Sequence, residues 1–391
     1  MKIIQGVTSY LTVVFIKDQV EFIRGNGYDV KVVCNKDFDS PYEGLEVEHI
    51  PFEREISPFK DIKTLFQLSR YLRKEKPDLI HFSTPKAGLL GMTAGFICGI
   101  KTRIYMIRGL RLETAAGLKK LILLSTEKLA SAFSTHVMVI SDSMELEVIR
   151  MNLTRKSKIV RIGKGSSSGI DLNRFNPSNI DDNHLSELQR KLYIHDEDFI
   201  IGYAGRLTKD KGIDLLIESF RKLYEVNSDL KLLLIGDFED SDPLKQENED
   251  IIHQHPNIIY VPYTDGMDYY YSMMDLFILP TFREGFSNVS IEAQSMGVPV
   301  VTFDSTGASD TVEHGTTGLI AESKSVEGLV KAIDGLMTND TKRKEMARIS
   351  REFIAENFDR DLMHQKLLDF YDSIRKQGDE NAEKDQNIQS T

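Results

Sequence analysis

The sequence of 391 residues predicts an α/β protein with two domains, each built on a mostly parallel sheet. Short apolar runs alternate with helical stretches in both halves of the chain, and this alternation is typical of parallel strands connected by helices. A polar segment, residues 166–198, separates the two series of runs. The length is sufficient for two domains that each bury a core. We therefore expect two Rossmann-like domains.

The expected strands follow one another in order along the chain. In the first half, the apolar runs are Lys2–Ile4, Asp29–Cys34, Asp78–Phe82, Arg103–Ile107, His136–Ile140 and Lys158–Ile162. In the second half, they are Phe199–Ala204, Leu230–Ile235, Asn257–Val261, Leu276–Leu279 and Val298–Phe303. Helical stretches alternate with these runs, so we expect helices to connect the strands.

The domain boundaries follow from this pattern. Residues 1–165 form the expected N-terminal domain and residues 166–357 the C-terminal domain, with a linker and a short helix near Pro177. A helical stretch over residues 342–376 is interrupted near Asn357. Residues 377–391 have almost no apolar content, so we expect this tail to be disordered.

Two glutamates separated by seven residues follow the expected strand Leu276–Leu279. Glu284 falls in the turn after the strand, and Glu292 falls in the opening turns of the next helix. Ligands bind at this edge of open parallel sheets, and a helix N-terminus presents unpaired N–H groups to an anion. The pattern predicts a phosphate seat between two carboxylates that accept hydroxyl hydrogen bonds. Its backbone N–H groups belong to Phe286, Ser287 and Asn288.

A second motif lies in the loop after the expected strand Phe199–Ala204. It begins at Gly205, contains Arg206 and Lys211, and leads into an amphipathic helix that starts near Ile213. Two fixed cations in one strand-to-helix loop can hold a diphosphate and neutralise its charge as it departs. The two motifs together therefore predict a diphosphate site that needs no metal.

These motifs resemble those of the large family-4 retaining glycosyltransferases of GT-B fold, over about residues 1–375. The resemblance rests on Gly205–Gly212, on Glu284–Glu292 and on His314–Leu319. The segments Ser83–Gly88, Gly165–Asp171 and Thr306–Asp310 are similar to the bacterial branch that builds capsular and related surface glycans on undecaprenyl-diphosphate. The resemblance implies two Rossmann-like domains that face a central cleft, with a C-terminal helix, about residues 358–376, returning to the N-terminal domain.

The resemblance further implies a retaining glycosyltransferase reaction. A hexose or N-acetylated amino sugar would pass from a UDP-sugar to an undecaprenyl-diphosphate-linked glycan, without a metal cofactor. Arg206 and Lys211 would stabilise the departing diphosphate, while Glu284 would bind hydroxyls of the transferred sugar. Glu292 would accept hydrogen bonds from the ribose. We therefore assign Glu284, Arg206 and Lys211 as catalytic, and Glu292, Gly205 and the residues 286–288 as substrate-binding.

The N-terminal half offers candidates for acceptor binding. Thr8 and Ser9 follow the first strand, and their short hydroxyl side chains can approach a sugar or a phosphate. Lys86 follows Pro85 at a helix start and is either a contact to an anionic acceptor or a surface lysine. Many family members carry a histidine where Arg108 stands, and an arginine cannot act as a general base. We therefore expect Arg108 and Arg111 to bind a diphosphate.

Charge is distributed unevenly between the two halves. Residues 1–165 carry 26 lysines and arginines against 18 acidic residues, or +8, while the remainder carries 23 against 42, or −19. The basic half predicts an anionic partner. Basic and apolar residues alternate over residues 103–128, which suits a membrane surface but also a solvated helix packed by its leucines. The start of the chain lacks a signal-peptide core, so we expect a cytoplasmic protein associated with the inner membrane face.

Several alternatives remain open from the sequence. A GT-B epimerase would use the same cleft, and a non-catalytic protein would only bind the sugar nucleotide. Nucleic-acid binding is disfavoured because the basic residues lack interleaved aromatics. His81 is either catalytic or a core histidine. The aspartate pairs Asp37–Asp39 and Asp240–Asp242 are interpreted as solvated loops rather than metal ligands.

Overall fold

The computed structural model describes residues 1–36, 45–53, 55, 57–113, 115–166 and 168–389, except for the side chains of Arg111 and of residues 377–389. The predicted aspartate pair Asp37–Asp39 lies outside the described residues. The chain divides into two compact units. Unit 1 comprises Met1–Gly169 and Asp361–Thr391, and unit 2 comprises Ile170–Arg360.

Unit 1 contains a seven-stranded sheet in which every neighbouring pair is parallel. The order is β3-β2-β1-β4-β5-β6-β7. The strands are β1 (Lys2–Ser9), β2 (Asp29–Asn35), β3 (Val47–His49), β4 (Leu79–Ser83), β5 (Thr102–Ile107), β6 (His136–Val139) and β7 (Ile159–Arg161). The order runs outward in opposite directions from β1 and β4, which makes this pair the topological switch point of the sheet.

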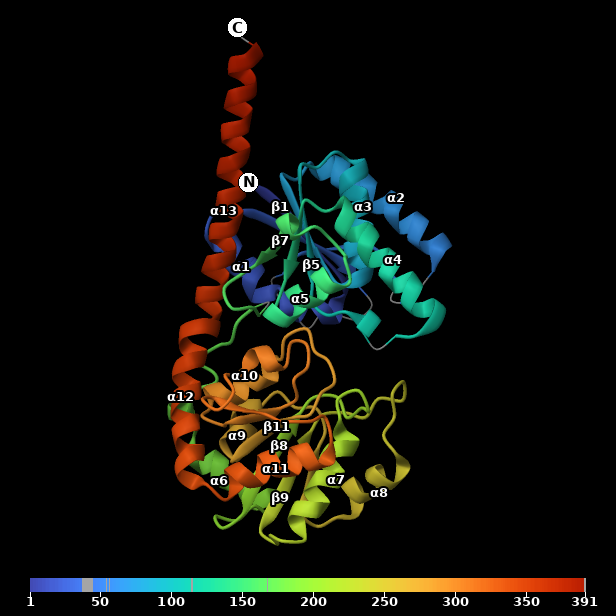
Figure 1. Ribbon diagram of the computed structural model, residues 1–391. Helices are drawn as coiled ribbons and strands as arrows, with labels where there is room; N and C mark the ends of the chain where they lie inside the picture. Colours follow the sequence, from blue (N-terminus) through green and yellow to red (C-terminus); the bar gives the residue numbers. More distant parts are fainter. Residues whose placement is uncertain (37–44, 54, 56, 114, 167, 390–391) are drawn as a thin grey trace. The chain divides into compact units, whose positions relative to one another are not determined.

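Helices cover both faces of this sheet (Figure 1). On one face, α3 (Pro85–Ile97) contacts β1, β4 and β5 and lies between α2 (Pro58–Glu75) and α4 (Gly117–Phe133). A side chain at Gly88 of α3 would approach the Tyr105 ring to 2.1 Å, so the close packing of α3 depends on glycine. The other helical segments before the chain enters unit 2 are η1 (Tyr10–Phe15), α1 (Lys17–Gly25), η2 (Arg111–Glu113), α5 (Asp142–Arg150) and η3 (Lys156–Lys158).

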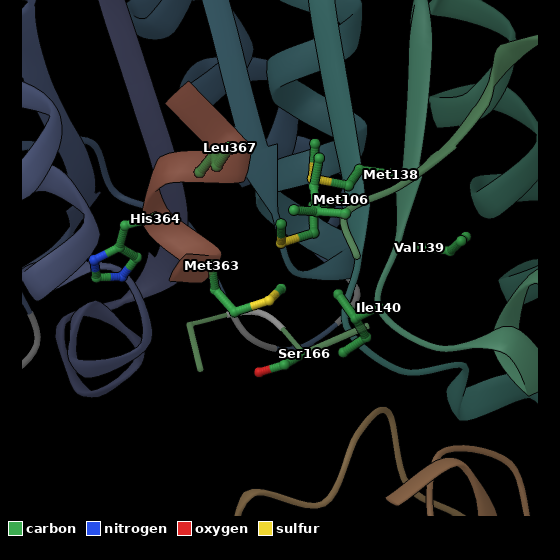
Figure 2. A pocket seen from close by; sticks show the side chains of 9 residues that line it. Met106, Met138, Val139, Ile140, Ser166, Met363, His364 and Leu367 are labelled. Carbon is green, nitrogen blue, oxygen red and sulfur yellow. The ribbon is translucent and has the colours of Figure 1, made fainter. Parts of the chain in front are cut away.

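The last helix, α13 (Arg360–Gln389), packs on the other face of the unit 1 sheet. Figure 2 shows Met363 and Leu367 of α13 lining a small cavity with Met106 of β5 and Met138 of β6. All four side chains are buried, so the first turns of α13 belong to the core of unit 1. The sequence predicts disorder for residues 377–391, whereas α13 continues to Gln389. Glutamate, glutamine, lysine and alanine in this segment favour a helix even without an apolar face.

Unit 2 contains a six-stranded parallel sheet with the order β10-β9-β8-β11-β12-β13. The strands are β8 (Phe199–Ala204), β9 (Leu230–Ile235), β10 (Ile258–Val261), β11 (Leu276–Leu279), β12 (Val300–Thr302) and β13 (Gly318–Ile320). The helical segments are η4 (Pro177–Asn179), α6 (Asp182–Lys191), α7 (Ile213–Tyr224), α8 (Gln246–Gln254), α9 (Met267–Ser272), α10 (Asn288–Ser295), η5 (Ser309–Thr311), α11 (Val326–Met337) and α12 (Asp340–Phe358). The strands are buried almost throughout, as expected for a parallel sheet covered on both faces.

The two ends of unit 2 are hydrogen-bonded to each other. The Ile170 N–H donates to the Phe358 carbonyl at 2.8 Å, and the Arg360 N–H donates to the Ile170 carbonyl at 2.9 Å. The chain therefore enters and leaves unit 2 at adjacent points. In the described part of the chain, no helix combines the length and the apolar character needed to cross a bilayer.

Candidate active site

The strand order of unit 2 places a switch point between β8 and β11. From this pair the sheet grows outward in opposite directions, and the loops at the carboxyl ends of two such strands diverge to form a crevice. The β8–α7 loop carries Arg206 and Lys211, and the β11–α10 loop carries Glu284. The topology thus brings the two predicted motifs to the same edge of one sheet.

Arg206 is held at this edge by its neighbours in the sheet. The preceding Gly205 donates its N–H to the carbonyl of Ile235 at 2.9 Å, and the Tyr203 hydroxyl donates to the Arg206 carbonyl at 2.9 Å. The guanidinium is about half exposed and forms an ion pair with Glu239, which follows β9. Partial burial lowers the pKa of Arg206, but the hydrogen bond and charge of Glu239 outweigh it, so the net shift is upward. Arg206 is a fixed cation that remains accessible.

Lys211 forms an ion pair with Glu284, so the two predicted catalytic residues meet directly. Their side chains are only 12% and 21% exposed, which limits screening of the pair by water. A second pair braces the same loops, because the Arg283 guanidinium donates to Asp210 at 2.9 Å. Burial raises the pKa of Asp210, but the Thr208 hydrogen bond and the nearby cations hold it below its usual value. The two loops are therefore joined by two adjacent ion pairs.

The β11–α10 loop is shaped by the loop that follows β12. The Glu284 N–H donates to the Thr306 carbonyl at 2.8 Å, and the Ser287 N–H donates to the Gly307 carbonyl at 3.3 Å. Gly307 has φ +72, and a Cβ there would lie 2.3 Å from the Gly285 carbonyl oxygen. Only glycine fits this position without strain. The loop is thereby held with α10 beginning at its end.

The N-terminus of α10 is where the sequence predicts a phosphate seat. Ser287 is the N-cap residue, and its buried hydroxyl has no hydrogen-bond partner among the described residues. Asn288 is the first residue of the helix. The Phe286 ring packs against Phe358 with 5.2 Å between ring centroids, so this residue can offer a ligand only its backbone. The first N–H groups of a helix have no intrahelical acceptor, and here they lie one turn from Glu284.

Glu292 is in the second turn of α10 and is fixed by a residue that the sequence did not single out. The hydroxyl of Tyr271, in α9, donates to Glu292 Oε2 at 2.9 Å. Burial raises the pKa of Glu292, while this hydrogen bond and the charge of Arg174 oppose the rise. Among the described residues, none donates a hydrogen bond to the other carboxylate oxygen, Oε1. Glu292 therefore has an oriented acceptor with free capacity.

The candidates of unit 1 lie at the carboxyl edge of its own sheet, again at the switch point. The hydroxyls of Thr8 and Thr84 are 2.6 Å apart, and Thr8 also accepts the Ala87 N–H at 3.3 Å. Ser9 serves as the N-cap of η1. Lys86 donates to Asp61 of α2 at 2.6 Å, and both side chains are less than one-fifth exposed. Thr8 thus joins the end of β1 to the start of α3, and Lys86 joins α3 to α2.

Arg108, directly after β5, is the exception at this edge. Its Nε is buried without a hydrogen-bond partner, and no described carboxylate forms an ion pair with it. The guanidinium lies over the Phe15 ring, 5.7 Å from the centroid. Burial lowers the pKa of Arg108 to about 10. Arg111 begins η2, and its side chain is outside the described part of the structure.

His81 lies beside Arg108 in the interior. Its Nδ1 is 2.5 Å from the Tyr371 hydroxyl of α13, and the side chain is 4% exposed. Burial, followed by the charge of Arg108, lowers the pKa of His81 to about 3. A neutral, hydrogen-bonded histidine in this position agrees with the interpretation as a core residue.

The structure adds residues that the motifs did not reveal. Glu239 pairs with the candidate Arg206, and Arg283 pairs with Asp210 of the same loop. Both lie in loops at this sheet edge, so pairing opposite charges between the loops would have found them. Tyr271 carries no such signal because it resembles any buried aromatic.

Asp242 was interpreted as solvated, yet its carboxylate accepts the Asp210 N–H at 2.8 Å. Within the described ranges, no three His, Cys, Asp or Glu side chains gather as a metal site.

The chain is similar to known proteins along nearly its full length. The family model for glycosyl transferases group 1 matches residues 186–353, and the model for a glycosyl transferase 4-like domain matches residues 12–165. The chain is 36% identical over 379 residues to the capsular polysaccharide biosynthesis glycosyltransferase CapM of Staphylococcus aureus, covering 97% of this chain and 98% of that protein. It is 24% identical over 360 residues to an Escherichia coli UDP-Gal:alpha-D-GlcNAc-diphosphoundecaprenol alpha-1,3-galactosyltransferase, covering 90% and 91%.

Solved structures share the fold. HepE from Anabaena, crystallised in complex with UDP and glucose, superimposes with a TM-score of 0.79 at 20% identity, covering 95% of this chain and 100% of that one. The sucrose-phosphate synthase of Thermosynechococcus elongatus gives a TM-score of 0.78 at 18% identity, covering 96% and 99%. With two parallel-sheet units, matched family models and a full-length relative, the chain belongs to the group 1, or family-4, glycosyltransferases of GT-B fold.

Proposed function

We propose that this protein transfers a sugar from a UDP-sugar to an undecaprenyl-diphosphate-linked glycan during bacterial surface polysaccharide synthesis, with retention of the anomeric configuration. The observation that carries the proposal is that the loop bearing Arg206 and Lys211 is joined to Glu284 by the Lys211–Glu284 ion pair at the switch point of unit 2. Two cations beside a helix N-terminus suit a nucleotide diphosphate. The HepE complex with UDP and glucose and the UDP-Gal-dependent Escherichia coli relative support a uridine donor.

Lys211 and Arg206 have the role of stabilising the leaving diphosphate. Arg206 is paired with Glu239, and Lys211 is paired with Glu284. When the sugar nucleotide binds, its charged phosphates can replace either carboxylate. Because Lys211 is little exposed, its attraction to the charge that develops on the leaving group exceeds that of a surface lysine. We assign this neutralisation to the two side chains and to the α10 N-terminus, rather than to a metal ion.

Glu284 has the role of a hydrogen-bond acceptor for the transferred sugar. No side chain at the site stands out as a general base for the acceptor hydroxyl. We therefore favour attack on the same face. The bond between the anomeric carbon and the phosphate oxygen breaks, the acceptor oxygen bonds to that carbon, and the acceptor proton passes to the leaving phosphate. Glu292, oriented by Tyr271, accepts hydrogen bonds from the ribose hydroxyls.

Arg108 has the role of binding the diphosphate of the acceptor. A partly buried guanidinium without a carboxylate partner carries a desolvation cost, and a phosphate would supply the missing charge and hydrogen-bond acceptors. The Escherichia coli relative acts on a diphosphoundecaprenol acceptor, and a Campylobacter jejuni relative, 25% identical over 343 residues, on a diphospho-undecaprenol acceptor. Catalysis would take place on the cytoplasmic face of the membrane.

The test is release of UDP from a panel of UDP-hexoses and UDP-N-acetylhexosamines, with and without a lipid-diphosphate-linked sugar and in excess EDTA. We expect one donor to release UDP only when acceptor is present, with EDTA causing no loss, and the product to keep the anomeric configuration of the donor. Conversion of the sugar without acceptor would identify an epimerase instead. Binding of UDP-sugars with no turnover under any condition would identify a sensor.

A further inference from the structure

The outer face of α2 carries large apolar side chains that no described residue of unit 1 covers. Phe59 is 90% exposed, Ile62 is 66% exposed and Phe66 is 68% exposed. Their spacing of three and four residues places them on one side of the helix. The opposite side buries Leu68 and Leu72 in the core. This helix therefore has a second apolar face that the fold does not use.

The outer face of α4 has the same character. Leu118 is 73% exposed, Leu121 60%, Ile122 37% and Leu129 45%, again at helical spacing. The inner side of α4 contributes Ala130 to the core and places Glu127 against the Tyr105 hydroxyl at 2.7 Å. We call the exposed side chains of the two helices the α2–α4 surface. Its members are Phe59, Ile62, Phe66, Leu118, Leu121, Ile122 and Leu129.

The two parts of this surface lie at one end of unit 1. Both helices pack against α3, which lies between them (Figure 1). Helices that connect parallel strands start at the carboxyl edge of the sheet, and Lys86 in the first turn of α3 is bonded to Asp61 in the first turn of α2. Most of the surface belongs to the first turns of α2 and α4. It is therefore near the sheet edge that carries Arg108.

Basic side chains surround the α2–α4 surface. Exposed cations on the two helices are Lys60, which pairs with Glu53, and Lys63, Arg70, Arg73, Lys74, Lys119, Lys120 and Lys128. The acidic residues of the same helices already have partners. Asp61 forms an ion pair with Lys86, and Glu75 forms ion pairs with Lys2 and Lys31. Glu127 accepts a hydrogen bond from the Tyr105 hydroxyl. The exposed faces thus combine apolar side chains with a positive rim.

We propose that the α2–α4 surface docks on an anionic phospholipid bilayer and brings the Arg108 edge of unit 1 to the lipid headgroups, an inference that rests on the proposed lipid-diphosphate acceptor. Phenylalanine and leucine side chains insert at the boundary between headgroups and acyl chains, while lysines remain among the phosphates. Clustered lysines are favoured by anionic lipid but are depleted from protein–protein interfaces. Charge complementarity therefore favours a bilayer over a protein partner.

The test is cosedimentation of the full-length protein with vesicles of phosphatidylcholine alone or with about one-third phosphatidylglycerol, a content that gives a negative surface potential. We expect binding to the anionic vesicles that weakens with salt, because salt screens exposed charges. The variant Phe59→Ser/Phe66→Ser/Leu118→Ser/Leu121→Ser should lower the partition coefficient at least about tenfold. The variant Lys119→Glu/Lys120→Glu should lower it on anionic vesicles only.

The control replaces two apolar residues of similar exposure in unit 2, Tyr193 and Val226, by serine. These residues are 77% and 79% exposed, and their replacement should leave vesicle binding unchanged. Equal loss in the control, or unchanged binding by the quadruple variant with its melting temperature intact, contradicts the proposal. Self-association of the wild type through these residues, seen by sedimentation and abolished in the quadruple variant, also overturns it.

Turnover of a short-chain, water-soluble acceptor diphosphate separates this inference from the proposed function. The quadruple variant should turn over the soluble acceptor like the wild type and lose activity only with acceptor embedded in vesicles. Turnover of the soluble acceptor without vesicle binding contradicts the docking surface alone. Vesicle binding without turnover of any acceptor contradicts the proposed function and leaves the docking result standing.

Discussion

The loop after β8 in unit 2 and the loop after β5 in unit 1 both lie at the carboxyl edge of a parallel sheet, but they manage positive charge in opposite ways. Arg206 and Lys211 are each paired with a glutamate. Arg108 is partly buried over a phenylalanine ring, with a buried Nε that has no hydrogen-bond partner among the described residues. Paired cations can exchange a carboxylate for a phosphate at little cost, whereas an unpaired buried cation gains most when an anion binds. Under the proposed function, the same topology supports two kinds of anion site.

The largest effect is expected from replacing Lys211, one of the two paired cations. Lys211→Met should lower kcat by about 10²- to 10³-fold, because a preorganised charge near the leaving group is lost, while the Kd for UDP measured by calorimetry should change much less. Lys222→Met is the matched control, since Lys222 forms an exposed pair with Glu327 in the same unit at 3.0 Å. If both variants retain wild-type kcat, Lys211 has no part in the reaction.

Replacement of Arg108, the cation without a carboxylate partner, should weaken acceptor binding but stabilise the fold. Arg108→Met should raise KM for the lipid-diphosphate acceptor about 10- to 100-fold through loss of a charged hydrogen bond. It should also raise the free energy of unfolding, because an uncompensated buried charge is removed. Steady-state kinetics and urea unfolding measure the two effects.

Arg103→Met is the control for this pair of effects. Arg103 is a partly buried arginine of unit 1 whose Nε donates to the Phe133 carbonyl at 2.6 Å. Its replacement should destabilise the protein because the carbonyl loses its donor. A destabilised Arg108→Met protein would show that the charge of Arg108 is already compensated in the ligand-free enzyme. That result would contradict its role as an anion-binding residue without a partner.

A smaller effect is expected at Glu292. Glu292→Gln should weaken UDP binding about tenfold, since a hydrogen bond to a neutral acceptor is weaker than one to a carboxylate. The same variant should bind 2′,3′-dideoxy-UDP as the wild type does, because this nucleotide has no ribose hydroxyls to lose. Tyr271→Phe, which releases the carboxylate from its 2.9 Å hydrogen bond, should give an intermediate loss. Equal weakening for both nucleotides would remove Glu292 from the ribose site.

The smallest effect concerns pH and the interior of unit 1. Since the pKa of His81 is lowered to about 3 in the folded protein, the unfolded chain binds one more proton between that pH and its usual value near 6.5. The stability due to His81 is complete above pH 6.5 and decreases as the pH falls. At pH 5.5 the decrease is about 1 kcal/mol. Urea unfolding should show a shallower pH dependence for His81→Asn than for the wild type.

Much of the fold could be predicted from the sequence because apolar runs report burial directly. The strands Phe199–Ala204, Leu230–Ile235 and Leu276–Leu279 have the predicted bounds. The prediction missed β3 (Val47–His49) and β13 (Gly318–Ile320), which are three-residue strands at sheet edges. Strands this short give no periodicity, and their pairing depends on a neighbour far away in the sequence.

The candidate site could be predicted in its residues but less so in their contacts. The positions of Arg206, Lys211 and Glu284 follow from loops at the ends of recognisable strands. Their partners do not, since the bond from Tyr271 to Glu292 joins two helices and the pair of Lys86 with Asp61 joins two others. A sequence motif identifies which side chains reach an edge, whereas tertiary packing decides which of them neutralise one another.

The adjacent ends of unit 2 have a consequence for how this protein can diversify. Because Ile170 is hydrogen-bonded to both Phe358 and Arg360, the stretch from residue 170 to residue 360 amounts to an insertion whose two junctions meet at one place. Such a cassette can be exchanged between related genes without cutting a strand of the surrounding sheet. Recombination at these two junctions would combine a new unit 2 with an existing unit 1 in a single event.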